Sequence, residues 1–429
     1  MTMIRPETEM KDSGIQWLGN IPKEWSIIKG KYILKQLSRS VLESDNVVTC
    51  FRDGEVTLRS NRRELGFTNS LKEIGYQGVE PGDLVVHGMD GFAGAIGISD
   101  SRGKMSPIIN VLESGECKKY LMYYLRGLAF VNVFLGLSTG IRERSCDLRW
   151  NKLANLEYTI PPLSEQQAIA DYLDETCSKI DEIIAEAKAS IDEYKELKQS
   201  VIFEAVTKGL DKNVNVYKTG NSWIPSLPVG IKLSRFGLHH DIILGKMLCP
   251  NPRNEEDTLE PYYCAANVHF DGVTGVLKTM WFNSKEKETY VVHKNDMLIV
   301  EGGAGAGGAA IMNEEPPVST FVQNSIMIVR SHMKDNRYSC YLVQALVKNK
   351  YVDVVCNKAT IPHFTKEKVS YMPYPVFNRN ERNEIANYLD ERCKQIDSLI
   401  AEKESLIHDL EAYKKSLIYE VVTGKRKVV

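Results

Sequence analysis

The sequence predicts an α+β protein in which two domains alternate with two long helices. Three observations support this fold class. The chain has 429 residues, which is too long for one ordinary hydrophobic core. One helical segment occurs twice at an offset of 216 residues, and each copy follows short apolar runs separated by glycine-rich turns. We therefore expect four consecutive segments, which are residues 1–160, 161–212, 213–376 and 377–429.

Composition and charge exclude several classes of protein. Hydrophobic residues make up 43% of the chain and charged residues 26%, as in globular proteins, which excludes a disordered or fibrous chain. The formal net charge of −2 excludes a simple polycation. The nine cysteines contain no Cys-x-x-Cys pair, so we expect a reduced, cytoplasmic protein without a metal site. The most apolar stretch, 121–137, contains Arg126 and Asn132, which predicts a buried helix and no membrane span.

The first domain is expected to combine short strands with one helix. An apolar run predicts a strand over 83–86, and an amphipathic pattern predicts a helix over 118–126. Near the start of the domain, Trp17-x-x-x-Ile21-Pro22 recurs in the second domain as Trp223-x-x-x-Leu227-Pro228. The two domains therefore share a skeleton, although most of their residues differ.

The first long helix is expected to begin after Pro161-Pro162, where Ser164-Glu165-Gln166-Gln167 predicts a capping box. Steps of three and four residues then place apolar side chains on one face, with the 3.5-residue period of a coiled coil. Lys198 interrupts this face, as a polar residue that fixes the register would do. The helix-pairing residues of this copy are Leu173, Ile180, Ile184 and Ile191.

The second domain repeats the pattern, with strands expected over 296–300 and 325–329 and a helix over 339–347. Its residues 303–308, Gly-Ala-Gly-Ala-Gly-Gly, match the G-x-G-x-x-G fingerprint of dinucleotide-binding proteins. Only seven residues separate this match from Pro316-Pro317, too few for the helix that such a site requires. We therefore expect a glycine-rich hairpin here.

The second long helix repeats the first without a gap. Its helix-pairing residues are Leu389, Ile396, Ile400 and Ile407, and Lys414 interrupts the seam at the position equivalent to Lys198. The first helix leads directly into the second domain, and the second helix starts at the end of that domain. We therefore expect the two helices to pair as an antiparallel coiled coil, which returns the second helix to the first domain and creates an approximate two-fold axis. The alternative is a stalk that pairs the helices of two separate chains.

Motifs for catalysis are scarce, and clustered donor side chains point to a recognition protein with no catalytic residues. The sequence contains no Walker A motif, no His-Glu-x-x-His and no Gly-x-Ser-x-Gly. Arginine side chains contact guanine edges, and lysine or arginine neutralises phosphates. Any single candidate could equally be a solvated surface charge. The candidate DNA-binding residues are Arg59, Asn61, Arg62, Arg63, Arg142, Arg144, Lys358, Thr360, His363 and Lys366, of which Arg142 and Lys358 occupy equivalent positions in the two domains.

Two variable domains, each followed by a similar long helix, resemble the specificity subunit of type I restriction-modification systems. Residues 17–22, Trp-Leu-Gly-Asn-Ile-Pro, are similar to the opening motif of that family. Residues 160–166, Ile-Pro-Pro-Leu-Ser-Glu-Gln, are similar to its junction between domain and helix. The second junction, residues 375–381, departs from this pattern because it lacks the Pro-Pro-Leu and the glutamine. The resemblance covers nearly the whole chain.

The resemblance implies two target-recognition domains, each contacting one half of a split site in double-stranded DNA. The two conserved spacer helices would pair, set the distance between the half-sites and dock two methyltransferase subunits. It implies no cofactor on this chain: adenosylmethionine would bind to the methyltransferase subunits, and ATP and Mg to two restriction subunits where the system has them. Two other hypotheses remain, which are a coiled-coil structural adaptor without DNA recognition and a nucleotide-dependent enzyme that uses residues 303–308.

Overall fold

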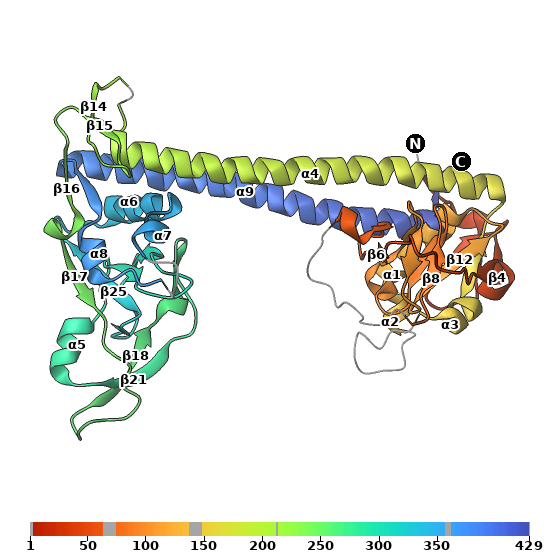
Figure 1. The fold of residues 1–429 in the computed structure, drawn as a ribbon, viewed down its shortest axis with the longest axis horizontal. Helices are drawn as coiled ribbons and strands as arrows, with labels where there is room; N and C mark the ends of the chain where they lie inside the picture. The colour runs from red at the N-terminus through yellow and green to blue at the C-terminus, as the bar shows by residue number, and fades with distance from the viewer. Residues whose placement is uncertain (1–2, 63–73, 137–147, 212, 357–361, 429) are drawn as a thin grey trace. The chain divides into compact units, whose positions relative to one another are not determined.

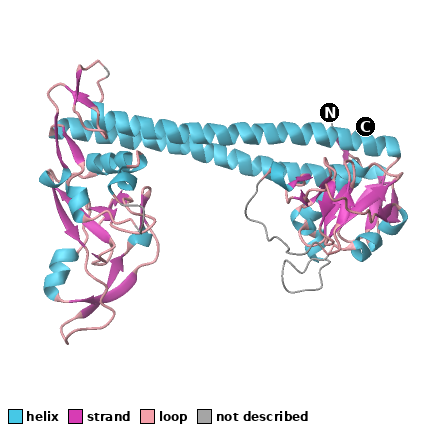
Figure 2. Ribbon diagram, in the orientation of Figure 1, coloured by secondary structure: helices cyan, strands magenta, loops and turns pink. Residues whose placement is uncertain are grey.

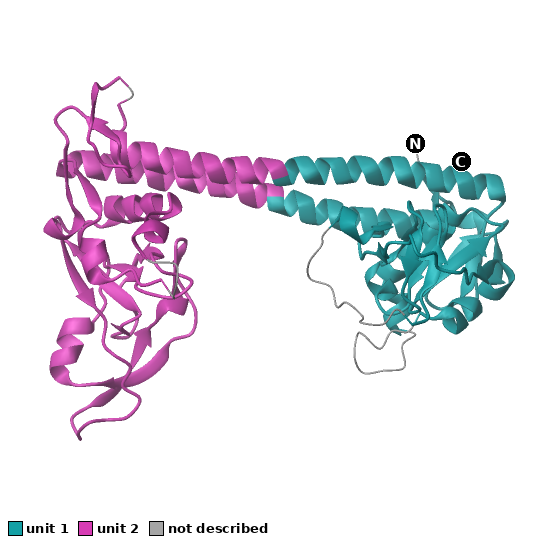
Figure 3. Ribbon diagram, viewed as in Figure 1, with its two compact units in different colours: residues 1–188, 404–429 teal, residues 189–403 magenta. Residues whose placement is uncertain are grey.

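The structure is a computed structural model that describes residues 3–62, 74–136, 148–211, 213–356 and 362–428. The chain divides into two compact units (Figure 3). Unit 1 comprises residues 1–188 and 404–429, and unit 2 comprises residues 189–403. Each unit mixes short strands with helices (Figure 2) and is described by itself.

Unit 1 is built around a four-stranded antiparallel sheet with the strand order β10-β9-β12-β5. These strands are β10 (Ile96–Ile98), β9 (Leu84–His87), β12 (Ile109–Ser114) and β5 (Leu34–Gln36). The smaller strand pairs are β1 (Met3–Ile4) with β27 (Arg426–Lys427), β2 (Met10–Asp12) with β3 (Asn20–Pro22), β4 (Ser26–Lys29) with β13 (Glu157–Ile160), β6 (Val48–Cys50) with β7 (Val56–Leu58), and β8 (Gln77–Val79) with β11 (Gly103–Met105). Its short helices are α1 (Lys118–Phe130), α2 (Val133–Gly136) and α3 (Trp150–Asn155).

Unit 2 contains a four-stranded antiparallel sheet of the same plan, with the strand order β23-β22-β25-β17. These strands are β23 (Ala309–Ile311), β22 (Met297–Val300), β25 (Ile326–Ser331) and β17 (His240–Leu244). A second sheet joins β21 (Lys278–Phe282), β18 (Thr258–Tyr263) and β24 (Phe321–Val322), and the remaining pairs are β14 (Val216–Lys218) with β15 (Ser226–Pro228), β16 (Lys232–Arg235) with β26 (Pro373–Val376), and β19 (Val268–His269) with β20 (Gly272–Val273). The short helices are α5 (Ser284–Tyr290), α6 (Arg337–Lys348), α7 (Tyr351–Val355) and α8 (Lys366–Ser370).

Two long helices, α4 (Leu163–Lys208) and α9 (Arg379–Val422), pack together (Figure 1). In unit 1 the first part of α4 packs with the last part of α9, and in unit 2 the last part of α4 packs with the first part of α9. The two helices are therefore antiparallel, and the predicted fold class is confirmed.

The end of each long helix is bonded to a domain helix by the same tyrosine contact. In unit 1 the buried hydroxyl of Tyr120 donates to the carbonyl of Thr159 at 2.7 Å and lies 3.2 Å from the carbonyl of Val422. In unit 2 the hydroxyl of Tyr338 lies 2.8 Å from the carbonyl of Val206 and 3.3 Å from that of Pro375. Each domain is thus hydrogen-bonded to the C-terminal end of one long helix, and the repeat seen in the sequence corresponds to the same contact made twice in the structure.

The helix starts differ from the sequence-based expectation. Helix α4 begins at Leu163, where the carbonyl of Pro162 accepts the amides of Glu165 and Gln166. The predicted capping box at Ser164 is wrong, because Ser164 lies within the first turn and the Gln167 amide donates along the helix to Asp171.

The second helix start does contain a capping box. The side chain of Asn378 accepts the amide of Glu381, and the Glu381 carboxylate accepts the amide of Asn378, both at 3.0 Å. The second junction, which lacks the Pro-Pro-Leu and the glutamine of the first, thus caps its helix by a different pair of side chains.

The glycine-rich segment 303–308 is a hairpin turn, as predicted. It joins β22 to β23, which pair antiparallel from Met297 with Ile311 to Ile299 with Ala309. The chain returns directly into β23 without a helix, so the amide donors of a helix N-terminus that a dinucleotide site needs are missing from this turn.

Candidate nucleic-acid interface and helix pairing

The paired helices are held in register by one ion pair in each unit. In unit 2 the Lys198 ammonium lies 2.7 Å from both carboxylate oxygens of Asp397. In unit 1 the Lys414 ammonium lies 2.6 Å from both oxygens of Asp181. The two pairs are equivalent under the 216-residue repeat, since each joins the interrupting lysine of one helix to the same aspartate position of the other. A slip of one helix turn would separate both pairs.

The eight predicted helix-pairing residues are largely shielded from solvent. Six of them are buried and two, Ile400 and Ile407, are partly buried. The buried ones are Leu173, Ile180, Ile184 and Ile191 on α4, and Leu389 and Ile396 on α9.

The first predicted cation cluster lies directly after β7. The described residues are Arg59, Asn61 and Arg62, while Arg63 lies outside the described ranges. The Arg62 guanidinium bonds to the carboxylates of Asp53 at 2.7 Å and Glu55 at 3.2 Å and lies 4.3 Å from the ring centre of Phe51. The charge of Arg62 is thus largely neutralised within the domain. Arg59 Nε donates to the hydroxyl of Thr49 at 3.3 Å. Asn61 donates to Thr57 at 2.8 Å.

The second predicted cluster is described only at its end. Arg142, Arg144, Lys358 and Thr360 lie outside the described residues. His363 is exposed and its Nδ1 lies 3.2 Å from Glu301, while Lys366 is the exposed first residue of α8.

In both units, the residues that follow the second predicted cluster are hydrogen-bonded to the turn after a central strand of the sheet, which is β9 in unit 1 and β22 in unit 2. In unit 1 the amide of Leu148 donates to the carbonyl of Gly88 at 2.8 Å, and in unit 2 the amide of Phe364 donates to Glu301 at 2.6 Å. The described residues that follow the two predicted contact segments are therefore hydrogen-bonded at equivalent places in the two domains.

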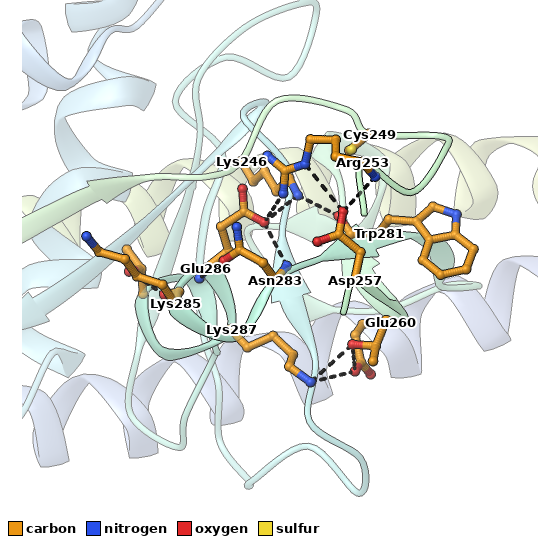
Figure 4. Close-up of polar contacts among 12 residues, drawn as sticks. Lys246, Cys249, Arg253, Asp257, Glu260, Trp281, Asn283, Lys285, Glu286 and Lys287 are labelled. Carbon is orange, nitrogen blue, oxygen red and sulfur yellow. Dashed lines mark hydrogen bonds and ion pairs between the residues drawn. The ribbon is translucent and has the colours of Figure 1, made fainter. Parts of the chain in front are cut away.

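A polar network that the sequence did not predict holds the loop between β17 and β18 (Figure 4). The buried Lys246 ammonium donates to Glu286 at 2.6 Å, and Arg253 donates to the same carboxylate oxygen at 2.7 Å. Burial opposes ionisation of Glu286, but these two donors outweigh it and lower its pKa to about 2. Arg253 also contacts Asp257, so the network closes the loop into a fixed arrangement. The capping box from Asn283 to Glu286 was visible in the sequence, but its link to Lys246, 40 residues away, was not.

The described residues give no sign of a membrane helix or a metal centre. Within the described ranges, no helix combines the length and the apolar character needed to cross a bilayer. In that same part of the chain, no three metal-binding side chains gather into a possible site.

No protein-family model matches the sequence. A chain from a solved structure of the type I R-M system, concerned with its complex assembly and conformational transition, aligns with a TM-score of 0.70 and 14% identity. That alignment covers 94% of this chain and 99% of the other. The HsdS subunit from Thermoanaerobacter tengcongensis aligns with a TM-score of 0.53 and 14% identity, covering 94% and 98% of the two chains. The chain has the fold of an HsdS subunit. The HsdS fold thus accounts for nearly all of the molecule, including both domains and both long helices.

Proposed function

We propose that this chain is the DNA-binding specificity subunit of a type I restriction-modification complex. The observation that carries the proposal is the duplication within the HsdS fold: two different domains share one sheet plan, and each is bonded to the same pair of register-locked helices. Duplicated domains of different sequence suit a split DNA site whose two halves differ. A nearly constant helix pair suits the spacing between the halves and the docking of two copies of one partner.

The partners of the proposed complex are two methyltransferase subunits and, where the system restricts, two restriction subunits. This chain supplies recognition and no catalytic residue. Adenosylmethionine binds to the methyltransferase subunits, and ATP and Mg bind to the restriction subunits. The proposed location is the cytoplasm, where the DNA is.

The candidate DNA contacts are the clustered donors of the two domains. In unit 2, His363 and Lys366 are exposed, and in unit 1, Arg59 is partly exposed directly after β7. We assign phosphate contacts to Lys366 and Arg59 and direct contacts with bases to Arg142 and Lys358, since a cation at an equivalent position in both domains suits an equivalent role.

The test is methylome sequencing of a host with and without the gene. We expect a split, adenine-methylated motif that disappears when the gene is deleted. A second measurement separates this function from that of a structural adaptor: the DNA affinity of the assembled complex should fall steeply with salt concentration, because a phosphate binder releases counterions. The proposal would be refuted if deleting the gene left the methylome unchanged and if the DNA affinity of the assembled complex did not depend on salt concentration.

A further inference from the structure

Unit 1 contains a largely buried guanidinium that has no carboxylate partner among the described residues. Arg126 lies on α1, and its Nε is buried without a hydrogen-bond partner in the described part of the chain. The guanidinium carbon lies 5.5 Å from the ring centre of Phe130, which offers only a weak cation–π contact. Burial lowers the pKa of Arg126, as expected for a cation that the surrounding fold compensates poorly. Arginine cannot escape this cost by losing its proton.

The fold makes room for this charge. One guanidinium nitrogen occupies the space where the Cβ of any other residue would stand at Gly54, in the turn between β6 and β7. Gly54 has a φ of +95°, a conformation that glycine adopts without strain. The turn is therefore suited to Arg126 in both its conformation and its missing side chain.

Arg126 lines an open groove of about 500 Å³ between α1 and the paired helices of unit 1. Three of the four carboxylates of this groove already have partners. The hydroxyl of Tyr123 donates to Asp174 at 2.7 Å, Lys414 bonds to Asp181, and Arg62 bonds to Asp53. Of the two cations in the described lining, Lys414 is paired with Asp181, whereas Arg126 has no ion-pair partner.

We propose that Arg126 binds a carboxylate side chain of a protein docked in this groove, and that this protein is a methyltransferase subunit. The proposal rests on the proposed function for the identity of the partner. The planar guanidinium can donate two parallel hydrogen bonds to a carboxylate. Arginine is also among the residues that contribute most to binding energy in protein interfaces. A desolvated cation that lacks a partner in the free chain gains one on docking.

The charge of the groove favours a protein over DNA. Four carboxylates line it, against the two cations Arg126 and Lys414; the four are Asp53, Asp174, Asp181 and Glu182. A phosphate backbone, with regularly spaced negative charges, would be repelled by this surface. A protein segment can place one acidic side chain at Arg126 and a basic side chain opposite Glu182.

The repeated groove of unit 2 lacks this cation. Tyr341 donates to Asp390 at 2.8 Å, as Tyr123 does to Asp174, so the two domain helices align and Gln344 takes the place of Arg126. The Gln344 amide donates to the carbonyl of Phe270 at 3.1 Å and is satisfied within the unit. If the chain binds two copies of one partner, Arg126 therefore acts on only one of them.

The test measures the stability of the free chain and its binding of the methyltransferase subunit for the wild type and R126M. We expect R126M to match or exceed the wild-type Tm, because methionine fills similar space and removes an uncompensated buried charge. We expect one of the two methyltransferase copies to bind at least about tenfold more weakly, because its carboxylate loses a charged partner. Native mass spectrometry during titration would show the change as accumulation of complexes with a single copy. R126K should fall between the two, since lysine keeps the charge without the bidentate geometry.

Lys152→Met, at an exposed cation of α3, is the matched control and should change neither measurement. The proposal is overturned if R126M lowers the Tm and leaves both copies bound with wild-type affinity, because Arg126 would then have a partner within the chain. It is also overturned if R126M weakens DNA binding by the free chain and leaves methyltransferase binding intact. A wild-type chain that takes up no methyltransferase subunit would instead contradict the proposed function itself, and that result precedes any substitution.

Discussion

The register of the helix pair should depend on the two repeated lysine–aspartate ion pairs. The perturbation is D397K, which places a lysine opposite Lys198 in unit 2, and the rescue is the double variant K198D/D397K, which restores an ion pair with the charges exchanged. The repeat provides a matched comparison in unit 1, where D181K faces Lys414.

The expected effect is modest because water screens the pair. The Asp397 side chain is 55% exposed and that of Lys198 is 26% exposed. An ion pair of this kind contributes ~0.2–1 kcal/mol to the free energy of unfolding. Two opposed lysines add a repulsion of similar size, so D397K should cost about 1 kcal/mol at low salt. In a unit of this size that loss lowers the Tm by ~2–4 °C.

The assay is differential scanning calorimetry of the chain at low and high salt. We expect D397K to lower the transition of unit 2, D181K to lower that of unit 1, and each charge exchange to recover most of the loss. The differences should shrink in 1 M NaCl, because salt screens the charges of solvent-exposed ion pairs. A D397K variant as stable as the wild type at low salt, or a double variant that is less stable than either single variant, would refute the role of these pairs in the register.

Three further outcomes are expected. His240 is buried between the carbonyl of Phe236 and the hydroxyl of Ser339, and burial lowers its pKa to about 4. The free energy of unfolding of unit 2 should therefore be unaffected by His240 above pH 6.5 and fall by about 3 kcal/mol as the pH falls towards 4, because only the unfolded chain takes up the proton in that range. His240→Gln should remove this pH dependence from acid unfolding curves. Replacing residues 1–160 by those of a relative with another target should change one half of the methylated site, and a change in both halves or in neither would contradict separate recognition. Arg142→Ala should relax preference at one base position at a cost of ~1–3 kcal/mol, whereas Lys366→Ala should weaken all sequences alike and reduce the salt slope by about one in binding titrations.

Strands and helices that repeat in the sequence were predicted well, because a pattern present in both copies marks the residues that form the same element in each domain. The strands expected at 83–86 and 296–300 are β9 and β22, the central strands of the two equivalent sheets. The helices expected at 118–126 and 339–347 are α1 and α6. Local competition for hydrogen bonds was harder to predict, which is why the cap at Ser164 was misplaced: the proline carbonyl before α4 accepts the first helical amides instead.

Contacts between residues far apart in the sequence could not be predicted from sequence patterns. The sequence marked Lys198 and Lys414 as interruptions of the seam, but their partners Asp397 and Asp181 depend on the exact register of two antiparallel helices. Arg126 was visible only as an interruption of an apolar stretch. Its lack of a carboxylate partner follows from how α1 packs on Gly54 and beside the long helices.

The sequence by itself determined the α+β class, the order of the four segments and the presence of two pairing helices, since periodicity and duplication are properties of the chain alone. The tertiary structure decided the antiparallel register, the tyrosine contacts that join each domain to the end of a long helix, and which cations are already neutralised. The physical reason is that apolar periodicity specifies which face of a helix is buried, whereas the partner of a charged or polar group is chosen by distances across the fold.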